Sequence, residues 1–484
     1  MRITVAVLDK KGDNAASAVT AALESMHLGN AGGFGLASPQ TLTFEKNIKN
    51  LQSKTLYSPI ALGCVYSGIL PKDKLQLTKT ENSTFAFEGR IYSPIPRTNT
   101  LKAIAKSLQK GGETAIEKLL KDTEGDFSLI IAGPERILAA RDPVGVQPLY
   151  YGENADVAGL GSHRKALWKL GIEEPRSFPP GHVAFIDQEG FKFKPVKTLA
   201  YAKPKQVAMQ KAAATLKRLL ERSVQLRVRD VKEVAVAFSG GLDSSVIAFL
   251  AEKCHVNVHL MHVSLRNQPE TEDAKRAAEE LKLPISVDLF SEEDVAKVVN
   301  RVVELIEEPD PVKVAVGIPF YWTAEKTAEA GFKVLLAGQG ADELFGGYQR
   351  YVNDYLSNGE EKARKTMFAD VSKLHESNIE RDRKICEYHD VELRLPFASY
   401  QIADFAVDLP VELKIERKAS SLRKLVLRKV AENMGLSASI VEKPKRAMQY
   451  ATGINGALKR LAKKEKTTVS DYLRKLFLNQ TTEK

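Results

Sequence analysis

The stretch SGGLDSS at residues 239–245 combines two glycines, three serines and one aspartate directly after an apolar run. Gly240 and Gly241 permit backbone conformations closed to other residues and let a ligand approach the main-chain N–H groups. Those N–H groups, the serine hydroxyls and the positive end of a following helix suit a phosphate. Asp243 adds a carboxylate that can hold Mg²⁺ beside the phosphates. Because no lysine follows as in GxxxxGK[ST], the stretch predicts a phosphate loop other than a Walker loop.

A second glycine-rich stretch, GQGADELFGGY at residues 338–348, also follows an apolar run. If the two runs end side by side, Asp342 becomes a second Mg²⁺ ligand opposite Asp243. The alternative is that Asp342 and Glu343 only begin a solvated helix. Together the two stretches predict a site for a nucleotide and its metal ion.

The chain around both stretches alternates strand-like apolar runs with helical patterns. EVAVAF leads into the first stretch and KVLLAG into the second, and VNVHLMHVSL and PISVDLF lie between them. Such alternation predicts a parallel sheet with helices on both faces. Ligands bind at the carboxyl ends of the strands in such sheets, which is where both stretches fall. From Asn353 onward the chain reads as mostly helical.

The first 200 residues differ from the rest of the chain. They contain short β-type runs broken by turn signals, with one helical pattern from Leu101 to Leu120. This texture predicts an α+β or sandwich-like domain. It changes at Tyr201–Gln206, so we expect one domain over residues 1–200 and a second over residues 206–484.

Composition limits the class of protein. The chain has 484 residues and a formal net charge of +10, and half of that charge lies in residues 459–484. A solvated terminal helix explains this tail about as well as a nucleic-acid contact does. The three cysteines are far apart, which favours neither a disulfide framework nor a zinc site. We expect a soluble, cytoplasmic protein, because no apolar run is long enough to span a membrane and no signal peptide is recognisable.

Motifs in both halves of the chain resemble those of the asparagine synthetase family. SGGLDSS is similar to the pyrophosphate loop of the N-type ATP pyrophosphatases, and residues 333–351 resemble the element SGEGADELFGGY. RDRKICEYHDVELRLPF at 381–397 and EKPKRAMQY at 442–450 resemble two further elements of the family. EGDF, ARDPVGVQPLYY and PPGH, between residues 124 and 182, resemble its amino-terminal half. The resemblance covers nearly the whole chain.

This resemblance implies a fold and an activity. The fold would be an α+β sandwich like that of N-terminal-nucleophile hydrolases, followed by an α/β doubly wound parallel sheet of the adenine nucleotide alpha hydrolase (PP-loop) type with a helical C-terminal part. The first domain, of class II glutamine amidotransferase type, would release ammonia from glutamine. The second would adenylate aspartate with ATP and Mg²⁺, and ammonia would attack the adenylate. A homodimer is also expected.

The resemblance implies site residues at the matching positions. The ATP and pyrophosphate contacts are Ala237, Ser239, Gly240, Gly241, Asp243, Ser244, Val263, Ala337 and Gly338. The metal ligands are Asp243 and Asp342. The catalytic positions are Lys445, Gln339 and Glu392. Lys445 would stabilise the attacked adenylate, because a cation facing developing negative charge in a dry site lowers the barrier. A surface lysine is the alternative for this residue.

The first domain departs from the family where glutamine hydrolysis needs it. The family's nucleophile is a cysteine at the mature amino terminus, whereas here Arg2 follows Met1 and the nearest cysteine is Cys64, inside an apolar run. An asparagine of the family donates to the oxyanion, and Glu88 stands at that position, where a carboxylate would oppose negative charge. We therefore predict that residues 1–200 do not hydrolyse glutamine.

The second domain departs less from the motifs of the family. Gln339 stands where the family usually has glutamate and Ala337 where it has serine, although glutamine still donates and accepts hydrogen bonds. Residues 308–322 match the segment that leads to substrate recognition only loosely. Aspartate is thus a weaker expectation than ATP chemistry.

Four functions stay open at this point. The first is an asparagine synthetase-like ligase that uses free ammonia or ammonia from a separate protein. The second is an amide- or lactam-forming relative with another acid and amine. The third is an RNA-modifying PP-loop enzyme, against which stands the lack of paired cysteines and of interleaved basic and aromatic residues. The fourth is a non-catalytic regulator with an altered site.

Overall fold

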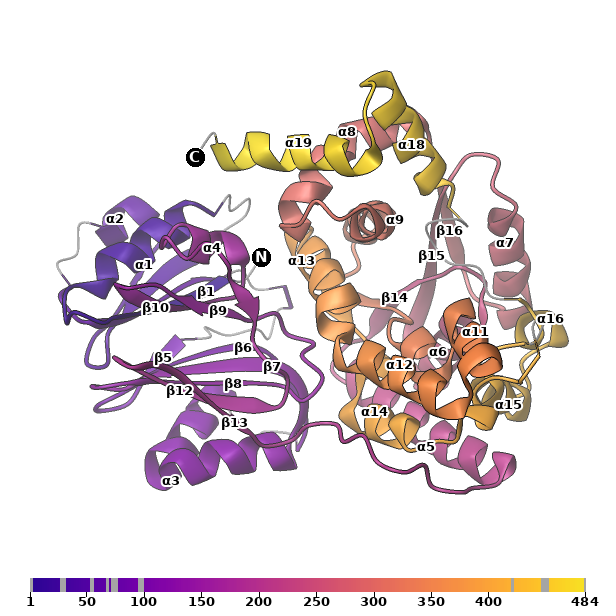
Figure 1. The fold of residues 1–484 in the computed structure, drawn as a ribbon, viewed down its shortest axis with the longest axis horizontal. Coiled ribbons are helices and arrows are strands. Elements are labelled where there is room, and N and C mark those ends of the chain that lie inside the picture. Colours follow the sequence, from indigo (N-terminus) through magenta and orange to yellow (C-terminus); the bar gives the residue numbers. More distant parts are fainter. Residues whose placement is uncertain are drawn as a thin grey trace. The chain divides into compact units, whose positions relative to one another are not determined.

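The computed structural model describes residues 3–26, 32–52, 56–66, 69–70, 77–94, 100–418, 422–444 and 452–482. The chain forms two compact units, Met1–Thr198 and Leu199–Lys484 (Figure 1). Tyr201–Gln206, where the sequence pattern changes from short β-type runs to helical spacing, lies at the start of the second unit. Among the described residues no helix is long and apolar enough to cross a membrane.

The first unit contains two antiparallel sheets. One has the strand order β11-β9-β10-β1-β4-β2-β3 and the other β13-β12-β8-β7-β6-β5. The strands are β1 Ile3–Asp9, β2 Gly33–Ala37, β3 Leu42–Glu45, β4 Ile60–Tyr66, β5 Leu77–Lys79, β6 Thr84–Ser93, β7 Glu124–Ala132, β8 Ile137–Arg141, β9 Tyr150–Glu153, β10 Val157–Gly161, β11 Arg176–Ser177, β12 His182–Asp187 and β13 Gly190–Pro195. The helices are α1 Ala15–Glu24, α2 Ile48–Gln52, α3 Thr100–Asp122 and α4 Arg164–Trp168.

Alternation along the strands explains how this unit is layered. In β1, Val5 and Val7 pack in a core with α1, whereas Ala6 and Leu8 pack in a core that joins the two sheets. A third core places α3 against the second sheet. Because side chains alternate across a strand, each sheet buries both faces and the unit has four layers, helix, sheet, sheet and helix (Figure 1).

The second unit is built on a five-stranded parallel sheet. Its order is β16-β15-β14-β17-β18. The strands are β14 Glu233–Ala237, β15 Asn257–Leu265, β16 Ile285–Phe290, β17 Val334–Leu336 and β18 Glu392–Arg394. The helices are α5 Met209–Val228, α6 Leu242–Glu252, α7 Glu270–Leu281, α8 Glu292–Ile306, α9 Pro311–Glu329, α10 Ala341–Phe345, α11 Gln349–Asn358, α12 Glu360–Ser372, α13 Glu380–Tyr388, α14 Tyr400–Val407, α15 Leu425–Asn433, α16 Ala438–Val441, α18 Ile454–Lys464 and α19 Val469–Thr482.

Two features of this sheet differ from the sequence expectation. Strand β18 lies in the region expected to be helical, and its three residues pair with β17 in parallel. Helix α9 runs through Pro319, although a proline usually ends a helical pattern in a sequence. Both differences arise from tertiary packing, and three buried residues are too few to show a period.

Candidate functional site

The loop after β14 turns sharply into α6, as the sequence predicts. The helix begins at Leu242, so Asp243 and Ser244 belong to its first turn rather than to the loop. Gly240 has φ +63°, and a Cβ there would lie 2.7 Å from the Cα of Ala274 in α7. Only glycine fits this position, because a left-handed residue and a close backbone approach coincide.

Polar contacts hold the loop in place. The Ser244 hydroxyl donates to the Gly241 carbonyl at 3.2 Å. The Nδ1 of His262 lies 2.9 Å from the Phe238 carbonyl, which requires that this nitrogen carries the proton and donates. Burial lowers the pKa of His262, so the ring stays neutral. His262 is thus a support for the loop, and nothing in the sequence separated it from an ordinary core histidine.

The end of β17 lies beside this loop. β14 and β17 pair in parallel, with Val236 opposite Leu336, so the residues that follow both strands meet at one edge of the sheet. A Cβ at Gly338 would lie 3.0 Å from the Asp243 Cβ. Asp342 lies in the first turn of α10. The two glycine-rich stretches therefore come together, which meets the condition under which Asp342 would lie opposite Asp243.

Lys424 joins the two aspartates. Its Nζ lies 2.5 Å from Asp243 Oδ2 and 2.7 Å from Asp342 Oδ1, and its side chain is 3% exposed. The residue has φ +63° and precedes α15. A Cβ at Gly347 would overlap the Asp342 carboxylate and Lys424 Cε, so glycine there allows the cluster to close. Sequence reasoning missed Lys424, because no motif we recognised includes it.

These groups line a cavity of about 390 Å³, a size typical of small-ligand sites. Most of the site residues expected from the sequence lie on its wall. They are Ala237, Ser239, Gly241, Asp243, Ser244, Val263, Ala337, Gly338, Gln339 and Asp342. Gly240 belongs to the same loop but does not line the cavity, and its carbonyl accepts from Lys443 Nζ at 3.2 Å. The predicted catalytic residue Lys445 lies outside the described residues.

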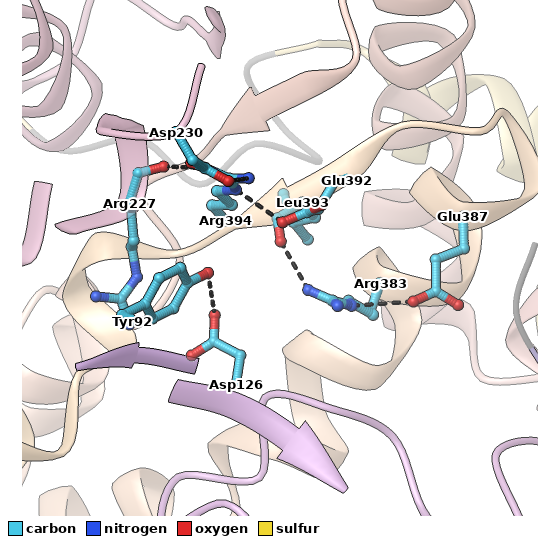
Figure 2. A network of polar contacts seen from close by, with 9 residues as sticks. All are labelled: Tyr92, Asp126, Arg227, Asp230, Arg383, Glu387, Glu392, Leu393 and Arg394. Atoms are coloured by element: carbon cyan, nitrogen blue, oxygen red, sulfur yellow. Dashed lines mark hydrogen bonds and ion pairs between the residues drawn. The ribbon is translucent and has the colours of Figure 1, made fainter. Parts of the chain in front are cut away.

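Glu392 does not lie on the wall of this cavity. It opens β18 opposite Val334, away from the carboxyl end of the sheet, and its carboxylate accepts from Arg394 Nε at 2.8 Å. Arg394 also donates to both carboxylate oxygens of Asp230, at 2.6 and 3.0 Å (Figure 2). Glu392 thus pairs with a buried guanidinium that joins β18 to the end of α5, and its catalytic role stays a prediction.

Two cations complete the described wall. Lys443 Nζ lies 3.2 Å from Asp273 Oδ2, and Arg428 donates to the carbonyl oxygens of Val441 and Lys443. These bonds hold residues 441–443 in place. Phe320 and Pro319 of α9 supply an apolar part of the wall. The cavity thus has a charged end at the glycine loop and an apolar side at α9.

The donor set fits Mg²⁺ together with phosphate oxygens. Asp243 and Asp342 provide hard carboxylate oxygens, and Mg²⁺ in nucleotide sites is held by one or two carboxylates with phosphates. No group of three or more possible metal-binding side chains occurs among the described residues. A metal held by Asp243 and Asp342 would take its other ligands from water and from nucleotide phosphates.

The first unit has a different interior. Cys64 on β4 pairs with Thr4 on β1, is 3% exposed and belongs to the core between the sheets. Burial, with a smaller effect of the Glu88 charge, raises the pKa of Cys64 to about 12. Glu88 on β6 is 2% exposed and accepts from Gln147 Nε2 at 3.1 Å. A thiol in this state is not a nucleophile at neutral pH.

The loop that carries the family-like segment ARDPVGVQPLYY is a packing element of the first unit. The Asp142 carboxylate accepts from the backbone N–H groups of residues 144–147 at 2.7–3.1 Å. Arg141 donates to the carbonyls of Gln147 and Gly145 at 2.7 Å. In the same unit Tyr92 donates to Asp126 at 2.9 Å (Figure 2). Arg141 and Asp142 thus provide hydrogen-bond partners for buried backbone groups of the loop, and this structural role explains the segment.

Fold and site together define a PP-loop nucleotide-binding α/β domain that follows an αββα sandwich domain. The asparagine synthase family model matches residues 215–358 and 352–483, and the glutamine amidotransferase domain model matches residues 77–169. The chain belongs to the asparagine synthase family. As a member of it, the chain is an ATP-dependent, asparagine synthetase-like carbon–nitrogen ligase, and the two fold types expected from the resemblance are confirmed.

Relatives from three organisms support this assignment. A putative glutamine-hydrolyzing asparagine synthetase from Methanocaldococcus jannaschii is 32% identical over 74% of this chain and 75% of its own length. A probable one from Dictyostelium discoideum is 26% identical over 64% of this chain. One from Asparagus officinalis is 28% identical over 73% of this chain. The match spans only 59% and 61% of the last two proteins.

Proposed function

We propose that the second unit joins a carboxylic acid to a nitrogen nucleophile by way of an acyl adenylate. A carboxylate oxygen of the acid attacks the α-phosphorus of ATP, the bond between the α- and β-phosphates breaks, and pyrophosphate leaves. The nitrogen then attacks the acyl carbon and AMP leaves. The meeting of the glycine loop, Asp342 and Lys424 at the ends of β14 and β17 is the observation that carries this proposal.

Each group in the cluster has a task in that reaction. The N–H groups after Ser239 and the cation of Lys424 stabilise the charge on the leaving pyrophosphate. Asp243 and Asp342 would hold Mg²⁺, which offsets charge on the phosphates when it is bound. Lys445 is proposed to stabilise the attacked adenylate. The acid is proposed to be aspartate or a related carboxylate, and an acid with another amine is the alternative.

We further propose that the nitrogen does not come from glutamine hydrolysed by the first unit. Cys64 is a buried, protonated thiol, and Glu88 places a carboxylate where an oxyanion donor is needed. Ammonia would then enter from solution or from a separate protein. A homodimer remains part of the proposal.

The test measures pyrophosphate exchange into ATP and AMP formation in the purified full chain. We expect exchange that depends on the acid, and AMP formation with ammonium but not with glutamine. Cys64→Ser should leave the ammonium-dependent rate unchanged. Glutamate release from glutamine that Cys64→Ser abolishes would overturn the proposal for the first unit. If aspartate gives no AMP while another acid does, asparagine synthesis fails but the ligase reaction stands.

A further inference from the structure

Gln339 follows β17 and lines the cavity, but one end of its amide is already occupied. Its Nε2 donates to Oδ2 of Asp382, a fully buried residue of α13. Asp382 is not among the residues that line the cavity. The hydrogen bond therefore points away from the cavity and holds the amide from the side opposite to it.

The Asp382 carboxylate is held as an acceptor by its neighbour. Arg381 donates from Nε to Oδ1 at 2.7 Å and from Nη2 to Oδ2 at 3.0 Å. Burial raises the pKa of Asp382, whereas the Arg381 guanidinium and the Gln339 amide act in the opposite direction. N–H groups of Arg381 and Gln339 donate to both of its oxygens, the arrangement of a hydrogen-bond acceptor. Nε2 is the end of the Gln339 amide that faces this carboxylate, so Oε1 is the end left for the cavity that Gln339 lines.

We infer that Asp382 is a positioning residue that presents Gln339 Oε1 to the attacking nitrogen. The inference rests on the proposed function and specifies its second step. Phosphates and the acyl carbonyl only accept hydrogen bonds, so they gain nothing from an acceptor such as Oε1. An ammonia or primary amine has an N–H to donate to it and a lone pair to direct at the acyl carbon. The site thus takes nucleophiles with at least two N–H bonds.

The reaction balances without a base at position 339. The nitrogen lone pair forms the new C–N bond, and the C–O bond to AMP breaks with its electron pair on the departing phosphate. The surplus proton goes to that phosphate, because an amide oxygen is a very weak base and Asp382 is ion-paired. Gln339 orients the nitrogen by one hydrogen bond and takes no proton.

The experiment compares Asp382→Asn with the exchanged pair Gln339→Glu plus Asp382→Asn. In the single variant the amide loses its fixed direction, and we expect the KM for ammonium to rise about ten-fold more than the KM for ATP, the effect of losing one such hydrogen bond. In the exchanged pair the amide introduced at position 382 donates to the carboxylate introduced at position 339, which again turns an acceptor oxygen to the cavity. The charge of the cluster is conserved, and we expect the KM for ammonium to return to within about three-fold of wild type.

Glu387→Gln is the matched control, because Glu387 is a buried carboxylate on the same helix, paired with Arg383 Nε at 3.1 Å (Figure 2). It should change the two KM values by the same factor. An equal change of both KM values in Asp382→Asn, or an exchanged pair that folds without recovering the KM for ammonium, would overturn the inference. Absence of acid-dependent exchange in the wild-type chain would instead overturn the proposed ligase reaction.

Discussion

Lys424 is the residue on which the charge balance of the nucleotide end depends. Two carboxylates approach one ammonium group, so the described cluster carries one net negative charge. If Mg²⁺ bound the two carboxylates, the same lysine would be free to offer its charge to phosphates. Its position 181 residues after Asp243 explains why no local spacing could reveal it.

Replacing Lys424 should affect both stability and metal binding. In Lys424→Met the two carboxylates lose the ammonium group that joins them. We expect the free energy of unfolding to fall by about 3 kcal/mol, at the lower end for a broken buried pair because both carboxylates are partly exposed. Acid-dependent pyrophosphate exchange should fall at least 100-fold.

Mg²⁺ tests the same cluster independently of activity. It should raise the melting temperature of Lys424→Met more than that of wild type, because the metal no longer competes with the ammonium. Lys429→Met is the control and should behave as wild type, because Lys429 lies in α15, is partly buried and pairs with Glu432 at 2.9 Å. A Mg²⁺ shift that is the same in all three proteins would contradict the assignment of Asp243 and Asp342 as metal ligands.

Cys64 gives a second residue-scale prediction. Its burial and a pKa of about 12 leave almost no thiolate at pH 8. In the native chain iodoacetamide should label Cys254, which is partly exposed, well before Cys64. Mass spectrometry of tryptic peptides with and without urea measures this order. Native labelling of Cys64 as fast as in urea would remove the physical support for an inactive first unit.

At the scale of elements, the strand–loop–helix unit of β14 and α6 depends on α7. The Cα of Gly240 packs against the backbone of Ala274 in α7. The distance between the loop and α7 is therefore fixed. The sequence pattern identified the loop, but it did not identify α7 as the surface against which the loop is pressed.

Gly240 and Gly331 both have left-handed backbones, so comparing them separates the energetic cost of the contact with α7 from the cost of backbone strain. Gly240→Ala should lose more stability than Gly331→Ala, because a Cβ at Gly331 meets nothing within 4 Å. The left-handed conformation alone costs about 1 kcal/mol, and the clash with α7 adds at least as much at Gly240. Urea denaturation measures both variants. Equal losses would mean that α7 yields to the added methyl group.

At the scale of the whole molecule, the stability of the second unit should depend on pH through His389. The ring lies 4.4 Å from Tyr321 between ring centroids, and burial lowers its pKa to about 4. A base with a lowered pKa binds its proton more readily in the unfolded chain. Its contribution is therefore complete above about pH 6.5 and is lost as the pH falls toward 4.

The expected loss is about 2 kcal/mol between pH 7 and pH 5. His389→Phe keeps an aromatic ring and should flatten this part of the profile. Urea unfolding of both proteins at pH 5, 6 and 7, followed by tryptophan fluorescence, measures the difference. Parallel profiles would show that the imidazole takes up its proton in the folded chain without cost.

The amino-acid sequence alone determined the strand–loop–helix character of SGGLDSS, the alternation typical of a parallel sheet and the family resemblance. These features are local, since glycine conformations, apolar periods and helix starts depend on neighbouring residues. It also located Asp243 and Asp342 at the ends of two strands. That both strand ends lie at one edge of the sheet follows from the general rule for parallel sheets, whereas the structure decided that β14 and β17 are neighbours.

Only the tertiary structure decided which distant residues meet those strand ends. Lys424 and Asp382 come from segments that join the cavity through packing, and β18 is too short to show a period of its own. The structure likewise showed Arg394 to be the buried partner of Glu392. Contacts of this kind depend on how whole elements pack, and residue spacing does not encode them.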